Sequence, residues 1–253
     1  MNRRKLLTGI AGSAAVAGCS LCLSATARAS SVHWGYEGEA GPDHWASLDD
    51  GYAACGLGQQ QSPIDLTDPV SAVVRDVELH WAGSKLNVVN NGHTIQANTD
   101  AGSYSVIGGK RFDLKQFHFH HPSEHRIAGR SFPMEAHFVH AAADGALAVL
   151  GVMMAEGAAN ETIGKVWRGM PKSKGEASDT DTIAPAHLLP ASRAFYRYAG
   201  SLTTPPCSEI VTWTVYADPI EVSGAQVEAF AGLFSNNARP VQQLRRRFLL
   251  GNF

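Results

Sequence analysis

Alternation of apolar and polar side chains is the dominant pattern of this chain from about residue 30 onward, and it predicts strands. The stretch 85–98 alternates on both sides of Asn91-Gly92. Asn-Gly between two alternating runs is the strongest short-range sign of a β-hairpin, because both residues tolerate the positive φ angles of a tight turn. Three further segments rich in β-branched, aromatic and other apolar residues predict strands, at 103–121, 134–154 and 209–217.

Helical periodicity is scarcer and is confined to two segments, 160–170 and 223–235. In the second, Ser223 can cap the first turn. Apolar residues recur there at helical spacing, at Val227, Phe230 and Phe234. The polar segment 171–190 contains prolines and predicts a loop. Strands therefore dominate, and the pattern predicts a β-dominated α+β fold with short peripheral helices in a single domain.

The first 29 residues differ from the rest and have the features of an export signal. A basic start that contains Arg3-Arg4 precedes an uncharged apolar run, and small residues precede position 30. This pattern predicts a signal peptide over 1–29, cleaved after Ala29, with residues 30–253 as the folded domain. The arginine pair gives the signal a twin-arginine character, which is typical of export after folding.

Two other interpretations of this segment stay open. It can act as an uncleaved membrane anchor, although its Gly, Ala and Ser content makes it only weakly apolar. Alternatively, the stretch "VAGC" that ends at Cys19 resembles a bacterial lipoprotein box, and lipid on Cys19 would then attach the protein to a membrane. The prediction is an exported protein of the bacterial periplasm.

Net charge argues against a nucleic-acid partner. The chain has 21 basic and 23 acidic residues, and four of the basic ones lie in 1–29, which has no acidic residue. Residues 30–253 therefore carry 17 basic and 23 acidic residues, a net charge of −6. Proteins that bind nucleic acid depend on a basic surface, so this class of partner is not expected.

Cysteine usage agrees with export. Cys19 and Cys22 lie within the predicted signal, which leaves Cys55 and Cys207 in the predicted mature chain. An even pair in an oxidising compartment predicts a disulfide. Two buried free thiols are the alternative.

The stretch "QFHFHH" at 116–121 contains three histidines in four positions. Side chains alternate between the two faces of a strand, so His118 and His120 share one face with Gln116. His121 shares the other face with two phenylalanines. Two imidazoles on one face can bind one metal ion, whereas a lone H-x-H run can also be the polar face of an ordinary strand.

A third ligand is available in "MEAHFVH", on the next predicted strand. There Glu135 and His137 share a face, while His140 faces the other way. Together with His118 and His120, His137 predicts a three-histidine Zn²⁺ site with water at the fourth position. Gln116 and Glu135 each lie two residues from a ligand on the same face, so each is suited to hold an imidazole N–H.

These motifs, in their order along the chain, resemble those of the α-class carbonic anhydrases. The resemblance is carried by "QFHFHH", "PSEH", "MEAHFVH", "LAVLG" and "GSLTTPPCSEIVTW", and also by "HWGY", "GPDHW", "QSPIDL", "NNGHTIQ" and "NNARPVQ". It implies a large, twisted, mostly antiparallel sheet with zinc at the bottom of a conical cleft. It also implies reversible hydration of carbon dioxide to bicarbonate and a proton, through a zinc-bound hydroxide.

The resemblance assigns roles to two threonines and a glutamate. Thr203 matches the residue that accepts a hydrogen bond from the hydroxide, and its own hydroxyl would donate to Glu124. Taken in isolation, a turn residue and a surface charge are the simpler interpretations of these two positions. Thr204 matches a residue that lines the site.

The resemblance also assigns a proton path. His93 matches the proton shuttle, a role that suits a side chain with a pKa near neutral pH, although the pattern alone makes it a hairpin residue. Residues that would order the connecting waters are Tyr36, Asn91 and Gln96. Gln96 is one methylene longer than the asparagine usual in the family, which is a departure within this water network.

An apolar wall for carbon dioxide is the last implied feature. Its residues match Val139, Val149, Leu202, Val211 and Trp213. The same five residues could equally be ordinary core. Only "AAADGA" separates "MEAHFVH" from "LAVLG", where animal members of the family have a longer insertion, so a more open cleft is expected.

Two rival functions fit parts of the pattern. A binding module with the same fold and no activity would lack one or more zinc ligands, whereas all three are present here. A different zinc hydrolase would need a carboxylate base facing the metal, and the near candidate, Glu124, is already assigned to Thr203.

Overall fold

The computed structural model describes residues 32–179 and 182–253. The predicted signal peptide over 1–29 and the alternative lipidation at Cys19 lie outside the described residues. Within the described ranges, no helix combines the length and the apolar character needed to cross a bilayer.

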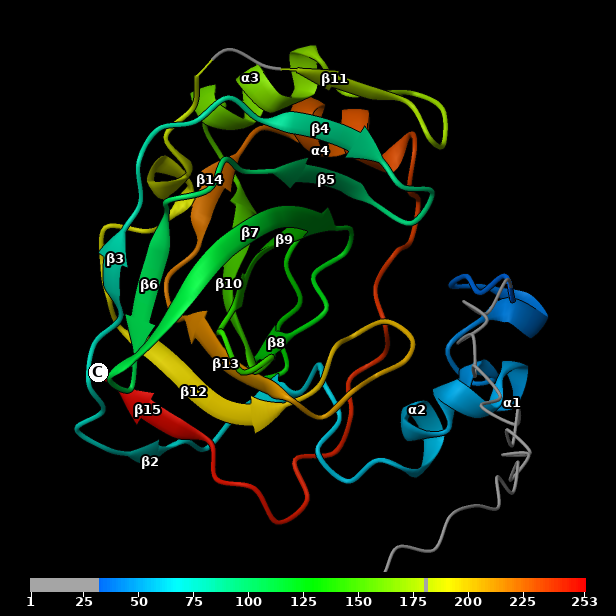
Figure 1. Ribbon diagram of the computed structural model, residues 1–253, viewed down its shortest axis with the longest axis vertical. Helices are drawn as coiled ribbons and strands as arrows, with labels where there is room; N and C mark the ends of the chain where they lie inside the picture. Colours follow the sequence, from blue (N-terminus) through cyan, green and yellow to red (C-terminus); the bar gives the residue numbers. More distant parts are fainter. Residues whose placement is uncertain (1–31, 180–181) are drawn as a thin grey trace, which may run out of the picture. The chain divides into compact units, whose positions relative to one another are not determined.

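One sheet of 13 strands organises the described chain, and its main path has ten of them side by side (Figure 1). In order along the sheet these are β11 (Ala177–Asp179), β4 (Asn87–Asn90), β5 (Ile95–Asn98), β7 (Lys110–His120), β9 (Met134–Ala141), β10 (Leu147–Glu156), β13 (Val211–Tyr216), β12 (Phe195–Gly200), β15 (Leu250–Asn252) and β2 (Val70–Ser71). Off this path, β14 (Ile220–Val222) pairs with β10, while β6 (Tyr104–Ile107) pairs with β7 and with β3 (Glu78–His80). A separate pair consists of β1 (Asp65–Leu66) and β8 (Arg126–Ile127).

Most neighbouring strands are antiparallel, as the resemblance implied. The exceptions in the large sheet are the pairs β10–β13, β10–β14 and β15–β2, which are parallel. β10 is therefore antiparallel to β9 on one side and parallel to β13 on the other. Most of its residues are buried, which explains why its sequence is a nearly continuous apolar run.

The predicted hairpins are confirmed. The strands β4 and β5 enclose Asn91-Gly92, and β6 and β7 enclose Gly108-Gly109. Both of these latter glycines have positive φ, 61° and 85°, as a tight two-residue hairpin turn requires. A short turn over 142–146 joins β9 to β10.

The predicted loop over 171–190 is only partly a loop. It contains β11 and the 3₁₀ helix η3 (Pro185–Leu188). β11 is too short and polar to produce an alternating pattern, and it forms because its backbone pairs with the edge of β4. Such pairing depends on a distant strand, so the local sequence carries little sign of it.

Both predicted helices are present, at α3 (Glu161–Arg168) and α4 (Gly224–Ala231). The Asn160 side chain caps α3, and Ser223 forms a capping box with Gln226 at the start of α4. Shorter elements precede the sheet: η1 (Gly38–Ala40), α1 (Trp45–Leu48), η2 (Asp50–Tyr52) and α2 (Ala54–Leu57).

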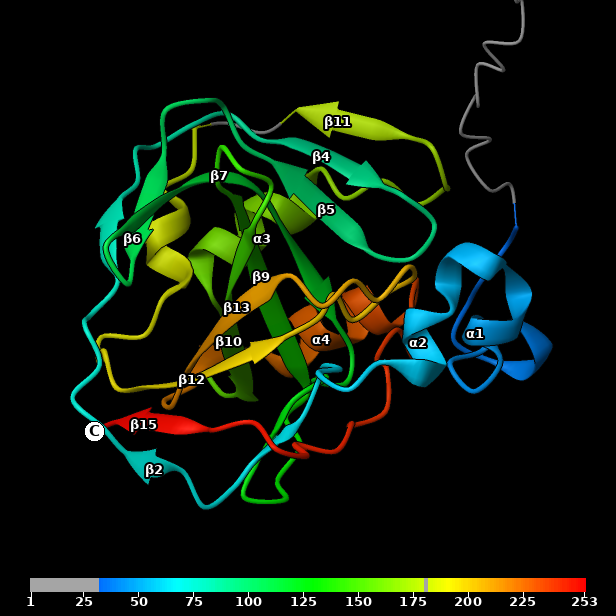
Figure 2. The same cartoon turned by 60° about the horizontal axis from the view of Figure 1, so that its bottom comes forward.

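The helices α3 and α4 pack on one face of the sheet at β7 (Figure 2). Phe119 of β7 meets Trp167 of α3 edge-on, with ring centroids 4.7 Å apart, and Trp167 stacks on Phe230 of α4. Phe117 and Phe119 are fully buried on this side. Because alternate residues of β7 face opposite ways, this packing directs His118 and His120 to the other face.

Candidate metal centre

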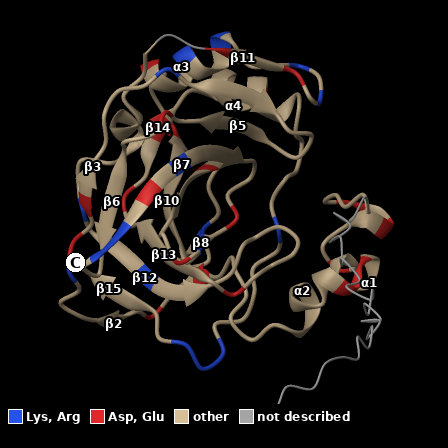
Figure 3. Ribbon diagram, viewed as in Figure 1, with Lys and Arg blue, Asp and Glu red and all other residues tan. Residues whose placement is uncertain are grey.

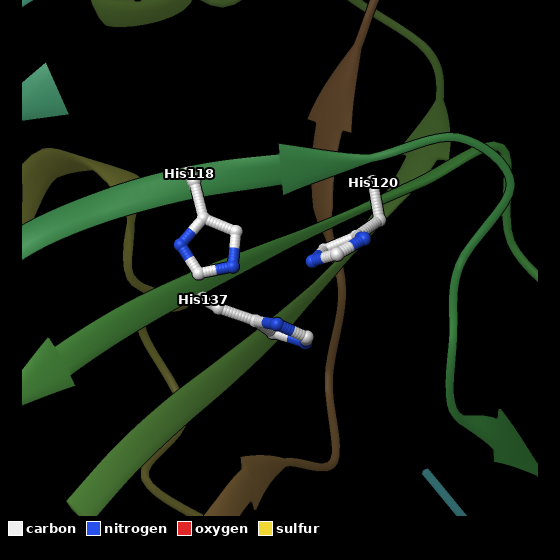
Figure 4. Close-up of side chains that lie close together, drawn as sticks. All are labelled: His118, His120 and His137. Atoms are coloured by element: carbon white, nitrogen blue, oxygen red, sulfur yellow. The ribbon is translucent and has the colours of Figure 1, made fainter. Parts of the chain in front are cut away.

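The register between β7 and β9 brings three histidines together. His118 lies directly opposite His137 in this antiparallel pair, so the two side chains are on the same face. The ring centroids of His118, His120 and His137 are 4.6–5.3 Å apart. One nitrogen from each ring lies within 4.8 Å of the other two (Figure 4). The predicted ligand set therefore converges on one point.

Each ring is oriented by a hydrogen bond from its other nitrogen. His118 Nδ1 donates to Gln116 Oε1 at 2.9 Å, and His137 Nε2 donates to Glu135 Oε1 at 2.8 Å, as expected from the sequence. His120 Nδ1 donates to the carbonyl oxygen of Asn237 at 2.7 Å. These bonds leave Nε2 of His118, Nε2 of His120 and Nδ1 of His137 free to bind a cation.

Two orphaned atoms support a cation at this point. His120 Nε2 and Glu124 Oε2 are buried and have no hydrogen-bond partner among the described residues. Glu124 Oε2 lies 3.5 Å from His120 Nε2 and 3.7 Å from His137 Nδ1. Unpaired buried polar atoms are costly, and here they gather where three imidazole nitrogens meet. Three imidazole donors with these free nitrogens fit Zn²⁺.

Burial favours the neutral, metal-binding form of two of the three histidines. Burial lowers the pKa of His118 well below its ordinary value, and the neighbouring His120 and His137 lower it further. Burial also lowers the pKa of His120, although Glu124 opposes this effect. For His137, the Glu135 carboxylate outweighs burial and raises the pKa.

Glu135 is the most heavily bonded carboxylate of the site. Its Oε2 accepts from the backbone N–H groups of Glu124 and His125, and its Oε1 accepts from His125 Nδ1 as well as from His137. Burial alone would raise the pKa of Glu135, but His125 and His137 hold it well below its ordinary value. The carboxylate therefore stays ionised and holds His137 in one orientation.

Two residues of this network were not among those selected from the sequence. His125 belongs to the motif "PSEH", and Asn237 belongs to "NNARPVQ". Asn237 also donates from Nδ2 to the carbonyl oxygens of His93 and Phe119, so it ties the end of β7 to the β4–β5 turn. Asn237 supports His120 through its backbone carbonyl oxygen, which every residue type has, so the residue type does not indicate this role. Only the position of Asn237 within the motif "NNARPVQ" could have pointed to it.

Thr203 and Thr204 lie in the loop between β12 and β13. The predicted disulfide between Cys55 and Cys207 is present. It links this loop, at Cys207, to α2, which contains Cys55. Thr203 is buried, at 5% exposure. Its expected hydrogen bond to Glu124 is not formed in the structure: Oε2 of Glu124 has no partner among the described residues, and Oε1 accepts from the backbone N–H of Arg239.

The five residues expected to form an apolar wall belong to one cluster. Val149 pairs with Val139 on one side and with Trp213 on the other. The cluster contains all of the predicted residues, Val139, Val149, Leu202, Val211 and Trp213. The indole ring of Trp213 lies 4.8 Å from the ring of His137, centroid to centroid, so the wall adjoins the histidine cluster.

The expected proton-path residues lie around the β4–β5 turn. Gln96 is directly opposite His118, and its Oε1 accepts a hydrogen bond from Asn91 Nδ2 at 3.4 Å. His93 stacks flat on Trp34, with ring centroids 3.8 Å apart. In that position burial, with Lys174 and then His33, lowers the pKa of His93 to about 4.

Tyr36 is the remaining residue of the expected path. Its ring meets Trp34 and Trp45 edge-on. Burial raises its pKa well above the ordinary value, and the charge of Glu124 raises it further. The Tyr36 hydroxyl is therefore neutral, and it interacts electrostatically with the Glu124 carboxylate beside the histidine cluster.

Both the sequence and the fold agree with known proteins. The family model for eukaryotic-type carbonic anhydrase matches residues 40–253. The chain belongs to this family. It is thus a carbonic anhydrase of the α class, a lyase, as the motifs "QFHFHH" and "MEAHFVH" indicated.

Individual carbonic anhydrases support this membership over most of the chain. A carbonic anhydrase of Nostoc sp. is 42% identical over 258 residues, which cover 98% of this chain and 97% of that protein. The solved structure of the α-carbonic anhydrase from Thermovibrio ammonificans, in complex with sulfanilamide, has a TM-score of 0.85 and 47% identity, and covers 87% of this chain and all of that one. The Photobacterium profundum α-carbonic anhydrase has a TM-score of 0.82 and 44% identity, with 86% and 100% coverage.

Proposed function

We propose that this chain catalyses the reversible hydration of carbon dioxide to bicarbonate and a proton, with Zn²⁺ held by His118, His120 and His137. The observation that carries the proposal is the convergence of three free imidazole nitrogens within 4.8 Å, each on a ring fixed by a separate acceptor. The membership of this chain in the carbonic anhydrase family supports the choice of reaction. When bound there, zinc supplies a Lewis acid that lets water ionise near neutral pH, as is known for carbonic anhydrases.

The protein's own groups orient the reactants. Thr203 is suited to hold the attacking oxygen through its hydroxyl, which can accept one hydrogen bond and donate another. The unpaired Oε2 of Glu124 is the available acceptor for that donation. Thr204 lies next to it in the same loop and lines the site. This arrangement would direct a lone pair of the attacking oxygen toward carbon dioxide.

The apolar wall suits the substrate. Carbon dioxide is small and uncharged, and a surface of valine, leucine and tryptophan side chains can hold it without offering a competing polar partner. Val139 and Leu202 remain partly exposed at the edge of this cluster, while Val149, Val211 and Trp213 are buried. The product, bicarbonate, is charged and would leave such a wall readily.

His93 is the proposed exit for the proton, through waters ordered by Tyr36, Asn91 and Gln96. Stacked on Trp34, the ring has a pKa of about 4, so in this position it is neutral at pH 7 and a weak base. A ring that leaves the stack loses the burial that lowers its pKa and regains a value near 6.5. Movement of the ring out of the stack is therefore part of the proposed shuttle.

The deciding experiment compares His118→Ala with His121→Ala, measuring bound zinc and carbon dioxide hydration by stopped flow. His121 belongs to the same histidine run, but its ring bonds to the carbonyl oxygen of Pro133, so its loss removes no ligand. We expect His118→Ala to lose stoichiometric zinc and hydration activity, while His121→Ala keeps both. Full zinc in His118→Ala would refute the ligand set. Bound zinc without hydration in the unaltered protein would instead favour a binding module.

We further propose that the protein is exported, with residues 1–29 as the signal. The Cys55–Cys207 disulfide supports this, because such bonds persist in oxidising compartments. The mass of the N-terminal peptide from the periplasmic fraction tests it: cleavage after Ala29 gives an unmodified Ser30, and the alternative gives a lipidated Cys19. Recovery of the intact N-terminus in the cytoplasmic fraction alone would contradict export.

A further inference from the structure

A basic cavity lies outside the histidine site, between two segments that are far apart in the sequence. It has a volume of about 630 Å³ and is lined by Gln59 and Gln60, which follow α2, and by Arg245, Arg246 and Arg247, which precede β15. No acidic residue contributes to its lining. Figure 3 shows the three arginines as a continuous blue stretch in the loop that leads into β15.

Arg247 stabilises the loop through four hydrogen bonds. Arg247 donates from Nε to the carbonyl oxygen of Leu244, from Nη1 to that of Ala199, and from Nη2 to those of Gln61 and Gln243, all at 2.8–2.9 Å. Every acceptor is a neutral carbonyl, so these bonds fix the guanidinium without neutralising its charge. The cavity thus has one rigid positive group in its wall.

The other two arginines are exposed, and their charges are also unpaired. Among the described residues, no ion pair involves Arg245, Arg246 or Arg247. The nearby carboxylate of Glu209 forms none of the ion pairs found among the described residues, and its Oε1 accepts from the backbone N–H of Gln60 and from Gln61 Nε2. Three adjacent positive charges therefore face one cavity with no anion of the protein bound to them.

The backbone and the electrostatics of the loop agree with a binding role. Arg245 has φ 55°, in the left-handed region that residues with a side chain adopt infrequently. Burial lowers the pKa of Arg247; Tyr198 and Glu209 oppose this, and the neighbouring charge of Arg245 adds to it. The loop thus places like charges close together, and an anion bound in the cavity would be attracted to all of them.

The geometry points to an oxyanion-binding site, formed by Gln59, Gln60 and Arg245–Arg247, that takes a phosphate-bearing ligand. Guanidinium groups match the oxygens of phosphate with paired hydrogen bonds, and glutamine amides add neutral donors. Residues 30–253 carry a net charge of −6, so this basic cavity is a local feature of an acidic chain. The site is independent of the histidine cluster and of the proposed hydration reaction.

Two sources can supply this chemistry, inorganic phosphate and the headgroup of a phospholipid. Phe248 directly follows the arginines and is 75% exposed, so an apolar side chain projects beside the charged cavity. That combination suits an anionic lipid surface, whereas the cavity, at about 630 Å³, also has room for a free oxyanion.

The experiment measures binding of both probes to the zinc-loaded protein. Inorganic phosphate is titrated while amide shifts of residues 59–60 and 245–248 are followed by NMR, and sedimentation is measured with phosphatidylglycerol vesicles against phosphatidylcholine vesicles. The test variant is Arg245→Ala with Arg246→Ala, which keeps the structural Arg247. The matched control is Lys165→Ala with Arg168→Ala, which removes the same charge from the exposed face of α3.

We expect at least one probe to bind the unaltered protein, with affinity falling about tenfold or more in the test variant and little in the control. Phosphate binding alone identifies a free oxyanion as the source, and binding to phosphatidylglycerol vesicles alone identifies a headgroup. Absence of binding by both probes overturns the proposal. So does equal weakening in the two variants, because that would reflect net charge rather than this cavity. Hydration activity is expected to stay unchanged in both variants.

Discussion

At the scale of single residues, the second ring nitrogen decides what each histidine does. His118, His120 and His137 give one nitrogen to a fixed acceptor and keep the other free. His125, in contrast, is bonded at both nitrogens, to Glu135 and to Tyr198. Identical side chains thus divide into candidate ligands and supports according to their hydrogen bonds.

The ligand histidines were predictable from the sequence, and their supports only partly so. Alternation on β7 and β9 gave His118, His120 and His137, together with Gln116 and Glu135, because a strand of period two assigns every residue to a face. The supporting roles of Asn237 and His125 could not be predicted from alternation, because neither residue shares a strand face with His118, His120 or His137. The bond from Thr203 to Glu124 was implied by resemblance and is not formed in the structure.

The shuttle role of His93 can be tested at the same scale. We expect His93→Ala to slow carbon dioxide hydration in dilute buffer by about tenfold or more, because proton removal then lacks its carrier. Added imidazole buffer should restore part of the rate. His33→Ala serves as the control, since His33 lies beside the same stack and is exposed. An unchanged rate for His93→Ala would assign proton transfer to buffer or another group.

At the scale of elements, His140 connects strands that do not pair. It lies on β9, its Nδ1 donates to the carbonyl oxygen of Phe138, and its Nε2 meets Ser105 Oγ of β6 at 3.1 Å. Ser105 Oγ in turn accepts from Trp81 Nε1. In the neutral ring Nε2 accepts from the Ser105 hydroxyl, and burial favours that form because it lowers the pKa of His140 from 6.5 to about 4.

This shift predicts acid destabilisation with a definite window. Between pH 6.5 and about 4 the unfolded chain binds a proton on His140 that the folded chain does not, so the free energy of unfolding falls as pH falls through this range. We expect a loss of about 2–3 kcal/mol at pH 4.5 relative to pH 7 from this residue. Urea unfolding of the unaltered protein and of His140→Gln, at both pH values, measures the difference. Equal losses in the two proteins would contradict the prediction.

The elements themselves show where sequence patterns succeed. Hairpins with Asn-Gly or Gly-Gly turns and capped helices were predicted because their signals are local, as for β4–β5 and α4. The strand β11 was missed because its existence depends on the backbone of β4, about 90 residues earlier. The parallel pairing of β13 with β10 likewise has no local sign.

At the scale of the whole molecule, two links join the N-terminal helices to the rest of the chain. The disulfide spans 152 residues from Cys55 to Cys207. Close to it, the buried Arg239 donates to the carbonyl oxygens of Cys55 and Ser62 and to Gln61 Oε1. The two links hold α2, the loop of Thr203 and the segment after α4 together.

Removal of the disulfide should therefore destabilise the protein. We expect Cys55→Ser with Cys207→Ser to lower the free energy of unfolding by about 2–5 kcal/mol, because the unfolded chain gains freedom across a long loop. Urea unfolding with and without reductant checks this. The reduced unaltered protein should match the variant, and reductant should leave the variant unchanged. A difference below about 0.5 kcal/mol would show that Arg239 and its neighbours hold the segments without the covalent bond.

The carbonyl oxygen of Asn237, which fixes His120, has a consequence for biosynthesis. This residue follows His137 by 100 positions, so a ribosome adding 5–20 residues per second completes the support about 5–20 s after the last histidine ligand. During that interval the His120 ring lacks the acceptor that it has in the folded protein. Zinc is therefore expected to be captured in its final geometry only after this late segment has been made, which places metal loading among the last steps of maturation.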